Sequence, residues 1–336
     1  MLMSRNVPVL IYGEILEGRL TSTTQELLGA GRTLADTPGR GLGIVLAGCS
    51  LPESIFREAI AFGADKVYVV DSPLLQDYHA DTYVSVMADI CHKLEPEILL
   101  LGQTSVGRDL APRLAFRLQV GLVTDCVGLK IDPETGLLIR TKPVYGGNAL
   151  ASYISEAKPQ VATVRPKSMA IAKDDPSRKG EIIISSPEQL VPPRTNLISR
   201  VEDREGAGKR LEAAEIIVCG GRGIGSADNF GYLQELARLL KGTVAASRPP
   251  CDLGWVPGEL QIGLSGKIVA PAVYIAVAVS GSTAHLAGCS NSKNIIAINT
   301  DSEANIFSVA HYGIVGDFRK VLPVIIERYM RNATKE

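Results

Sequence analysis

Short apolar runs that alternate with helical patterns are the feature that most constrains the fold of this chain. Five such runs in the first half predict strands, at Val9 to Ile15, Gly43 to Ala47, Lys66 to Val70, Ile98 to Gly102 and Gln160 to Val164. Between them, Thr23 to Asp36 and Tyr83 to Leu94 carry apolar residues near helical spacing. Strands that alternate with helices predict βαβ units, and the uniformly apolar strands predict a parallel sheet covered on both faces.

The second half repeats this pattern. Further strands are predicted at Glu215 to Cys219, Thr243 to Ala246, Val273 to Val279, Asn294 to Ile298 and Gly313 to Val315, with a helix at Asn229 to Leu240. A chain of 336 residues is long enough for two domains of average size. The sequence therefore predicts two α/β domains, each built on a parallel sheet.

The boundary between these domains is predicted in a polar segment. Residues 174–210 are rich in Pro, Ser, Arg and Glu, and they contain the strand-like stretch Ile182 to Ile184. A linker is placed near Pro192 to Lys209. The predicted domains are residues 1–195 and 211–336, joined by a hinge at residues 196–210.

Composition excludes several classes of function. Lys and Arg number 35 and Asp and Glu 36, so a net charge of −1 provides no field for nucleic acid or an anionic membrane. The six cysteines are spread singly and only four histidines are present, so no metal site is expected. The N-terminus lacks the pattern of a secretory or mitochondrial targeting segment and no run would insert into a membrane. We expect a cytoplasmic protein; a mitochondrial matrix protein after removal of its presequence is the less favoured alternative.

Two glycine-bearing turns suggest a binding site in the second domain. Gly220 to Gly225 directly follows one predicted strand, and Ser280 to Gly288 follows another. The carboxyl ends of parallel strands meet at one edge of a sheet, where open α/β sheets bind ligands. Backbone N–H groups of such turns can approach a phosphate closely, so the pair suggests a nucleotide cofactor. The GLSGK run at Gly263 to Lys267 is not a phosphate-binding loop, because Ile268 stands where a hydroxyl residue is required.

Other candidates leave alternatives open. Ala246 to Pro257 has little helix or strand propensity and predicts an ordered loop, at a binding site or at a proline-stiffened domain interface. His285 adjoins a glycine turn, but a single histidine is more often structural than catalytic. No acid–base pair or nucleophile arrangement stands out, which favours redox transfer, where a cofactor carries the reaction.

Several ordered motifs in the second half resemble a known family. They are Ala246-Ser247-Arg248, Gly254-Trp255-Val256-Pro257, Gly263 to Pro271, Tyr274-Ile275-Ala276, Ser280-Gly281, His285-Leu286-Ala287-Gly288, Ala297-Ile298-Asn299 and Tyr312 to Asp317, with Gly107-Arg108-Asp109 and Thr163 to Pro166 in the first half. Together they are similar to the electron transfer flavoprotein alpha subunit family over nearly the whole chain. The resemblance implies a Rossmann-like N-terminal parallel sheet, like that of nucleotide hydrolases, and a C-terminal FAD-binding α/β domain with a mainly parallel sheet.

The resemblance also implies an activity. Such a subunit forms a heterodimer with a beta subunit, holds one FAD and passes electrons from flavoprotein dehydrogenases, such as acyl-CoA dehydrogenases, to a redox acceptor. It is an electron carrier subunit rather than a stand-alone enzyme. The positions that match the FAD-binding motifs are Arg222, Ser247, Arg248, Ile262, Gly263, Leu264, Ser265, Ser280, Gly281, Ser282, Thr283, Ala284, His285, Asn299, Asp317 and Phe318.

The resemblance assigns roles to some of these residues. Arg248 would place a cation beside the isoalloxazine ring and favour its anionic reduced forms, Ser265 would donate toward N5, and His285 would lie near the pyrimidine end. Backbone N–H groups of residues 280–283 would take the pyrophosphate. Asn299 and Asp317 would then serve the ribose or adenine end.

Two features point toward a subtype, and two other functions remain as alternatives. Residues 26–32 and 124–126 look more like anaerobic bacterial members, which raises electron bifurcation with NADH oxidation; the beta subunit would then hold a second FAD in place of AMP. A nicotinamide-dependent oxidoreductase would need a GxGxxG turn with an acidic residue about 20 positions on, which is absent. A non-redox adenine-nucleotide-binding regulator would use the first domain.

Overall fold

The computed structural model describes residues 7–36, 41–145, 149–186, 190–199, 211 and 214–333. Apart from residues 145–148, the chain divides into two compact units between residues 200 and 201. Most of the predicted hinge, residues 200–210, lies outside the described residues. None of the described helices is both long and apolar enough to cross a lipid bilayer.

A seven-stranded sheet forms the centre of the first unit, and every neighbouring pair in it is parallel. Its order is β12 (Glu181–Ile184), β5 (Lys66–Asp71), β4 (Leu42–Gly48), β1 (Val9–Gly13), β6 (Ile98–Gly102), β11 (Gln160–Val164) and β7 (Leu122–Cys126). The five strands predicted in this half are confirmed. The first is shorter than expected, because the chain turns after Gly13 into the hairpin β2 (Ile15–Leu16) and β3 (Arg19–Leu20).

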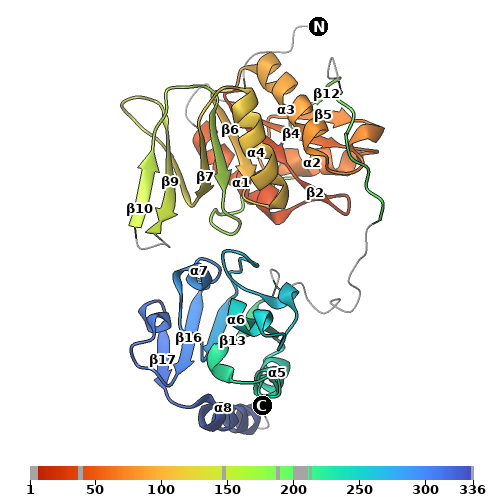
Figure 1. Cartoon of the computed structure of the whole chain (residues 1–336). Helices are drawn as coiled ribbons and strands as arrows, with labels where there is room; N and C mark the ends of the chain where they lie inside the picture. Colours follow the sequence, from red (N-terminus) through yellow and green to blue (C-terminus); the bar gives the residue numbers. More distant parts are fainter. Residues whose placement is uncertain are drawn as a thin grey trace. The chain divides into compact units, whose positions relative to one another are not determined.

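Helices cover both faces of this sheet (Figure 1). The helices α1 (Ser22–Ala35) and α2 (Glu53–Ala61) pack on one face, and α3 (Ala80–Leu94) and α4 (Ser105–Arg117) pack on the other, with the short 3-10 helix η1 (Pro73–Leu75) beside α3. Threonines set two of the helix starts: Thr21 accepts a hydrogen bond from Thr24 N and Thr104 accepts one from Gly107 N. Because alternate strand residues face opposite helix layers, nearly all strand residues are apolar, as predicted.

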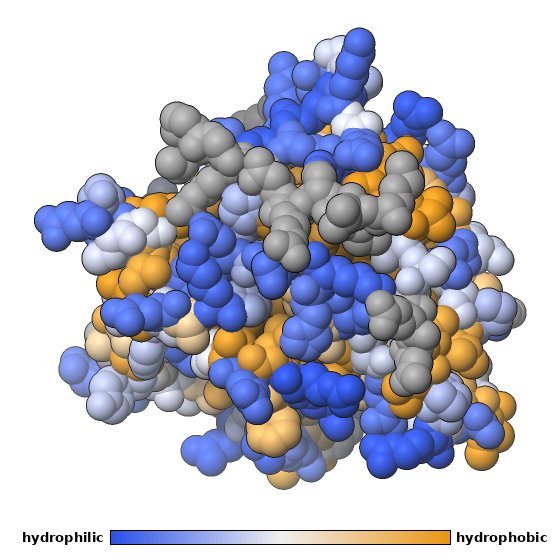
Figure 2. Space-filling view, turned by 90° about the horizontal axis from the view of Figure 1, so that it is seen from above, coloured by the Kyte–Doolittle hydropathy of each residue, from blue (hydrophilic) through white to orange (hydrophobic). Residues whose placement is uncertain are grey.

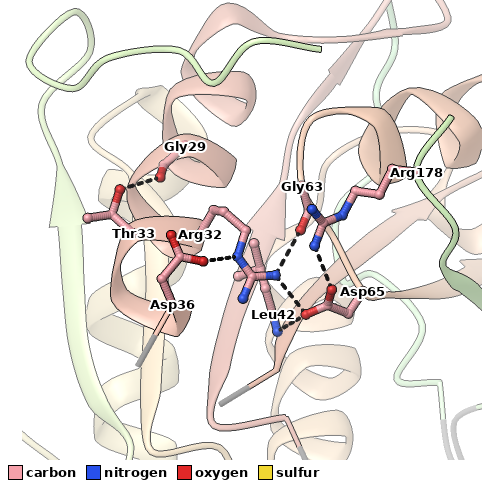
Figure 3. A network of polar contacts seen from close by, with 8 residues as sticks. All are labelled: Gly29, Arg32, Thr33, Asp36, Leu42, Gly63, Asp65 and Arg178. Atoms are coloured by element: carbon pink, nitrogen blue, oxygen red, sulfur yellow. Dashed lines mark hydrogen bonds and ion pairs between the residues drawn. The ribbon is translucent and has the colours of Figure 1, made fainter. Parts of the chain in front are cut away.

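The strand β12 was not placed in the first sheet from the sequence. Ile182 to Ile184 was recognised only as a strand-like stretch in a weak polar segment, and the structure pairs it with β5 at the edge of the first sheet. A polar network fixes the chain just before it (Figure 3). The Asp65 carboxylate accepts hydrogen bonds from Arg178 Nη2 at 2.8 Å and from Arg32 Nη1 and Leu42 N, each at 2.9 Å. These contacts tie the segment that leads into β12 to α1, β4 and β5.

A small antiparallel sheet also belongs to this region and was not predicted. It consists of β8 (Gly128–Ile131), β9 (Leu138–Val144) and β10 (Ala149–Tyr153), in the order β10-β9-β8. The edge strand β10 leaves Leu150 67 % exposed and Tyr153 43 % exposed. Figure 2, a view from above coloured by hydropathy, shows apolar patches that lie between polar side chains. Exposed apolar side chains on an edge strand are typical of a surface that another chain covers.

The second unit contains a five-stranded parallel sheet. Its order is β14 (Thr243–Ala246), β13 (Ile216–Gly220), β15 (Val273–Val277), β16 (Asn294–Asn299) and β17 (Tyr312–Val315), and all five strands were predicted. One face packs against α5 (Phe230–Leu239) and α8 (Phe318–Ala333). The other face is covered by irregular segments together with α7 (Thr283–Leu286) and η6 (Asn305–Ser308). Three further short elements are η4 (Arg222–Ile224), α6 (Arg248–Asp252) and η5 (Gly258–Leu260).

Candidate functional site

The order of strands in the second unit predicts where a ligand binds. Numbered along the chain within this unit, the strands lie in the order 2-1-3-4-5, so the direction of winding reverses between β13 and β15. Loops at such a switch point diverge and leave a crevice outside the carboxyl ends of the strands. The turn after β13 and the turn after β15 are the two glycine-bearing segments that the sequence analysis selected.

A cavity of about 540 Å³ opens at this point, which is within the size range of small-molecule and cofactor sites. A second cavity of about 210 Å³ shares Gly223, Ala278 and Asn299 with it and extends toward the start of α8. Of the predicted FAD-binding residues, the first cavity is lined by Arg222, Ser247, Arg248, Ile262, Gly263, Leu264, Ser265, Ser280, Ser282, Ala284, His285 and Asn299, and the second by Asn299, Asp317 and Phe318. Gly281 and Thr283 line neither.

The position of Gly281 still bears on the shape of the cavity. Its φ is +80°, and a Cβ added there would lie 2.2 Å from Ile306 N. Hydrogen bonds hold the two segments together, from Ile306 N to Ser280 O at 3.1 Å and from Asn305 Nδ2 to Gly281 O at 2.7 Å. Only glycine allows this approach at low cost, so Gly281 determines the shape of the turn although it does not line the cavity.

The segment after β14 corrects a second expectation. Ala246 to Pro257 was predicted to be a loop, but residues 248–252 form the helix α6. Proline is tolerated in the first turn of a helix, because the N–H groups there have no partner within the helix. The helix brings Arg248 and Asp252 one turn apart, and Arg248 Nε lies 3.1 Å from Asp252 Oδ2. Both side chains are mostly exposed, so this ion pair is weak and leaves the guanidinium at the cavity wall.

His285 is the most buried polar side chain of the first cavity, with 4 % of its surface exposed. Its Nε2 lies 2.9 Å from the Tyr274 hydroxyl and its Nδ1 lies 3.1 Å from the carbonyl oxygen of Ile262. Burial lowers the pKa of His285 to about 4, although the hydrogen bond to Ile262 acts in the opposite direction. The imidazole is therefore neutral at physiological pH. Both of its nitrogens have protein partners, which agrees with the structural interpretation that the sequence left open.

Polar contacts connect the loops around the cavity. Asn299 donates from Nδ2 to Val279 O at 2.9 Å and accepts from Asp301 N at 3.0 Å, which joins the turns after β15 and β16. Leu264 N donates to Ala284 O at 2.7 Å and so links the GLSGK segment to α7. Because these bonds are internal to the protein, the cavity wall is formed before any ligand binds.

Several residues of the cavities were missed by the sequence analysis. They are Gly223, Pro249, Asp252, Gln261, Ala278, Val279, Asp301 and Ala304 in the first cavity, and Ile298, Thr300, Gly316 and Arg319 in the second. Asp252 could have been found from its spacing of four residues after Arg248, had a helix been expected there. Gln261 donates to the exposed Ser265 hydroxyl at 2.9 Å, a contact that no local sequence pattern predicts.

At the corresponding switch point of the first sheet, two protein side chains are hydrogen-bonded to each other. Glu14 follows β1 and Thr104 follows β6, the two strands between which the winding of the first sheet reverses. The Thr104 hydroxyl donates to Glu14 Oε1 at 2.6 Å, and burial raises the pKa of Glu14 despite this bond. A carboxylate at this edge opposes an anionic phosphate, which argues against the regulator that would bind a nucleotide in the first domain.

Two family models match the chain. Residues 9–190 match the electron transfer flavoprotein domain, and residues 210–290 match the electron transfer flavoprotein FAD-binding domain. The first match lies within the unit built on the seven-stranded sheet, and the second includes the first cavity up to α7.

Relatives of similar length agree with these matches. The electron transfer flavoprotein subunit alpha of Thermoanaerobacterium thermosaccharolyticum is 45% identical, over 94% of this chain and 96% of the relative. The subunit of the same name from Bacillus subtilis is 41% identical, over 96% and 97%. Protein FixB of Clostridium saccharobutylicum is also 41% identical, over 95% of each chain. The chain belongs to the electron transfer flavoprotein alpha subunit family.

Proposed function

We propose that this chain binds FAD in the cavity of its second unit and, paired with a beta subunit, passes electrons from a flavoprotein dehydrogenase to a redox acceptor. The observation that carries the proposal is the cavity at the switch point between β13 and β15, lined by hydroxyl, guanidinium and backbone groups. The match of residues 210–290 to the electron transfer flavoprotein FAD-binding domain supports flavin binding in this unit.

The residues around the two cavities fit a dinucleotide flavin. The turn at residues 280–284 lies at the carboxyl end of β15, where backbone N–H groups and the Ser280 and Ser282 hydroxyls bind the pyrophosphate. Asn299 lines both cavities and Asp317 lines the second one. These two residues hold the adenosine portion of the ligand. The two cavities share lining residues, which supports an extended ligand rather than a mononucleotide.

The isoalloxazine end is assigned to the side of the cavity next to α6. Bound FAD supplies the capacity to take up and release electrons one or two at a time. Arg248 stabilises negative charge there, because its guanidinium is held only by a weak, exposed ion pair. Ser265 offers a hydroxyl, and His285 contributes a neutral, buried imidazole. The residues orient the ring and set its potential, and no bond of a substrate has to be broken.

The beta subunit docks on the first unit. The exposed apolar side chains of the edge strand β10, Leu150 and Tyr153, together with Ile154 after it, support an interface on the small antiparallel sheet. The electron donor is a flavoprotein dehydrogenase of the acyl-CoA dehydrogenase type. We place the complex in the cytoplasm, because all six cysteines are free thiols, as expected in a reducing compartment.

Cofactor stoichiometry tests this function. The chain is co-expressed with its beta subunit, the purified heterodimer is saturated with FAD, and flavin and AMP are counted after extraction. One FAD and one AMP per heterodimer, with reduction by a dehydrogenase and no response to NADH, is the expected result. A heterodimer without flavin after saturation would contradict the proposal.

The same experiment distinguishes the second candidate function. Two FAD per heterodimer with flavin reduction by NADH would assign the chain to a bifurcating complex, in which the second FAD lies in the beta subunit. The motifs of residues 26–32 and 124–126 are the observation in favour of this alternative. The residues that decide between AMP and FAD belong to the partner chain.

The domain limits remain part of the proposal. We propose residues 1–195 and 211–336 as the domains, with residues 196–210 as the segment that joins them. The division between residues 200 and 201 supports this. A protease of broad specificity, applied briefly, is expected to cut first within residues 196–210; first cuts inside either domain would contradict these limits.

A further inference from the structure

The wall of the first cavity is backed by a buried chain of polar side chains that the proposed function does not use. Tyr274 lies on β15 with 0 % of its surface exposed, and its hydroxyl is 2.9 Å from His285 Nε2. On the other side of the imidazole, Nδ1 is 3.1 Å from the carbonyl oxygen of Ile262. A carbonyl oxygen only accepts hydrogen bonds, so Nδ1 carries a proton.

This contact decides the direction of the next bond. A neutral imidazole with its proton on Nδ1 has only an acceptor at Nε2, so the Tyr274 hydroxyl must donate to it. A cationic imidazole would instead donate from both nitrogens, but no carboxylate among the described residues hydrogen-bonds to this ring, and the ring is buried.

Two thiols lie near the tyrosine. Cys219 and Cys289 are both fully buried, and both contribute to the raised pKa of Tyr274. Burial raises the pKa of both thiols, to about 12 for Cys289, and raises that of Tyr274 well above 10. All three groups are therefore neutral at physiological pH.

We propose that Tyr274 is a positioning residue for the flavin site: by donating to Nε2, it holds His285 as a neutral imidazole with its proton on Nδ1 at the cavity wall. The redox meaning of this role rests on the proposed FAD site, whereas the tautomer belongs to this chain alone. Among the described residues, the titratable group that contacts the ring is Tyr274, which in turn has Cys219 and Cys289 near it.

The consequence concerns the charge beside the ligand. With His285 held neutral, the positive charge at the first cavity comes from arginine side chains, whose charge does not change over physiological pH. The flavin potential then contains no contribution from protonation of His285 between about pH 6 and 8. Without the tyrosine hydroxyl, Nε2 becomes a buried acceptor with no donor, so the neutral imidazole loses the hydrogen bond that favours it over the cation.

The tautomer is tested in the apoprotein by two-bond proton–nitrogen correlation spectra of the imidazoles, with His285→Gln used to identify the His285 signals among the four histidines. The wild type is expected to show a proton on Nδ1 and no titration of His285 above about pH 5.5. A wild-type His285 that carries its proton on Nε2, or that is cationic at pH 6, would overturn the proposal without any variant.

The variant Tyr274→Phe keeps the ring and removes only the hydroxyl. The pKa of His285 is expected to rise by about one unit, because one hydrogen bond to the neutral form is lost. Tyr68→Phe is the matched control: Tyr68 is equally buried on β5 of the first unit and its hydroxyl has no hydrogen-bond partner among the described residues, so His285 should be unaffected. An unchanged pKa in Tyr274→Phe would show that the tyrosine does not position the imidazole.

The FAD-loaded heterodimer supplies the second readout. From about pH 6 downward, the flavin potential of Tyr274→Phe is expected to rise relative to the wild type, while Tyr68→Phe follows the wild type. Parallel potentials in all three proteins would overturn the redox part of the proposal. If no flavin binds to the wild type, the proposed function fails. The tautomer measured in the apoprotein then still tests whether Tyr274 positions His285.

Discussion

Arg248 places a positive charge at the wall of the larger cavity, and its side chain is mostly exposed. The residue lies at the start of α6, directly after Ser247, which is buried and donates its backbone N–H to Gly220 O at 2.9 Å. The strand end thus fixes the backbone while the guanidinium stays free to turn toward a ligand. A charge held in this way stabilises an anion more effectively than one bound in a strong ion pair.

Arg248→Ala is expected to lower the flavin potential. Loss of a charge about 4 Å away is worth about 1 kcal/mol in water and more inside a protein, which corresponds to a decrease on the order of 50 mV for one electron. Redox titration of the FAD-loaded heterodimer measures it. Arg248→Lys should recover part of the loss, and Asp252→Asn should leave the potential unchanged or slightly higher. Identical titrations for wild type and Arg248→Ala would refute the assignment.

At the scale of the elements, β12 shows how a strand can be attached by polar contacts. Three donors converge on Asp65, from α1, from the start of β4 and from the segment before β12. Burial raises the pKa of Asp65, but the hydrogen bonds from Leu42, Arg178 and Arg32 outweigh it and hold the pKa below its usual value. A carboxyl with a lowered folded-state pKa stabilises the fold above its unfolded pKa of about 4, and this stabilisation is lost as the pH falls further.

Asp65→Asn is therefore expected to reduce the free energy of unfolding by about 1–2 kcal/mol at pH 7, with little difference from the wild type near pH 3. Urea unfolding at the two pH values measures this. Asp36→Asn is the control, because Asp36 contacts the same Arg32 from an exposed position and should cost only a few tenths of a kcal/mol. A difference between Asp65→Asn and the wild type that does not depend on pH would contradict this account.

The turn after β15 requires a glycine at position 281, and this requirement can be measured. Gly281→Ala puts a methyl group against the backbone of Ile306 at a positive φ, so we expect a loss of more than about 2 kcal/mol in the second unit and weaker FAD retention. Gly254→Ala separates the two causes, because Gly254 has a similar φ of +72° but nothing within 4 Å of the added carbon. That control should cost about 1 kcal/mol and retain FAD. Equal effects of the two substitutions would show that the contact with Ile306 is unimportant.

At the scale of the whole molecule, the chain has separate cores in its two units. The described core residues form two clusters around the seven-stranded sheet and two around the five-stranded sheet. Each sheet buries its apolar residues against its own helices and loops, so each unit can fold cooperatively by itself.

Ligand binding should therefore stabilise one unit selectively. At an FAD concentration of about 100 times Kd, amides in residues 214–333 are expected to gain up to about 2.7 kcal/mol of protection in hydrogen exchange, while those in residues 7–199 do not change. Mass spectrometry of peptides from the heterodimer with and without FAD measures this. Equal protection of both units would mean that they open as one cooperative body.

The family and the edge of the sheet that binds ligands could be predicted from local patterns. Buried parallel strands need continuous apolar runs, and glycine turns have to follow strands where loops approach one another, so both leave local signals. The antiparallel strands β8 to β10 were missed because most of their side chains are half-buried or exposed and give no clear apolar pattern. The helix α6 was missed because two prolines in five residues suggest a loop unless they fall in the first turn.

The sequence by itself determined the parallel type of the two large sheets, most of the strands that form them and the turns that end at one edge, because these depend on neighbouring residues in the chain. Only the tertiary structure decided that β12 joins the first sheet, that Glu14 occupies the switch point of the first unit, and that Tyr274 lies against His285. Each of these contacts joins residues that are 11 or more positions apart. Such pairings are set by the packing of whole elements, which leaves no periodic signal in the sequence around either partner.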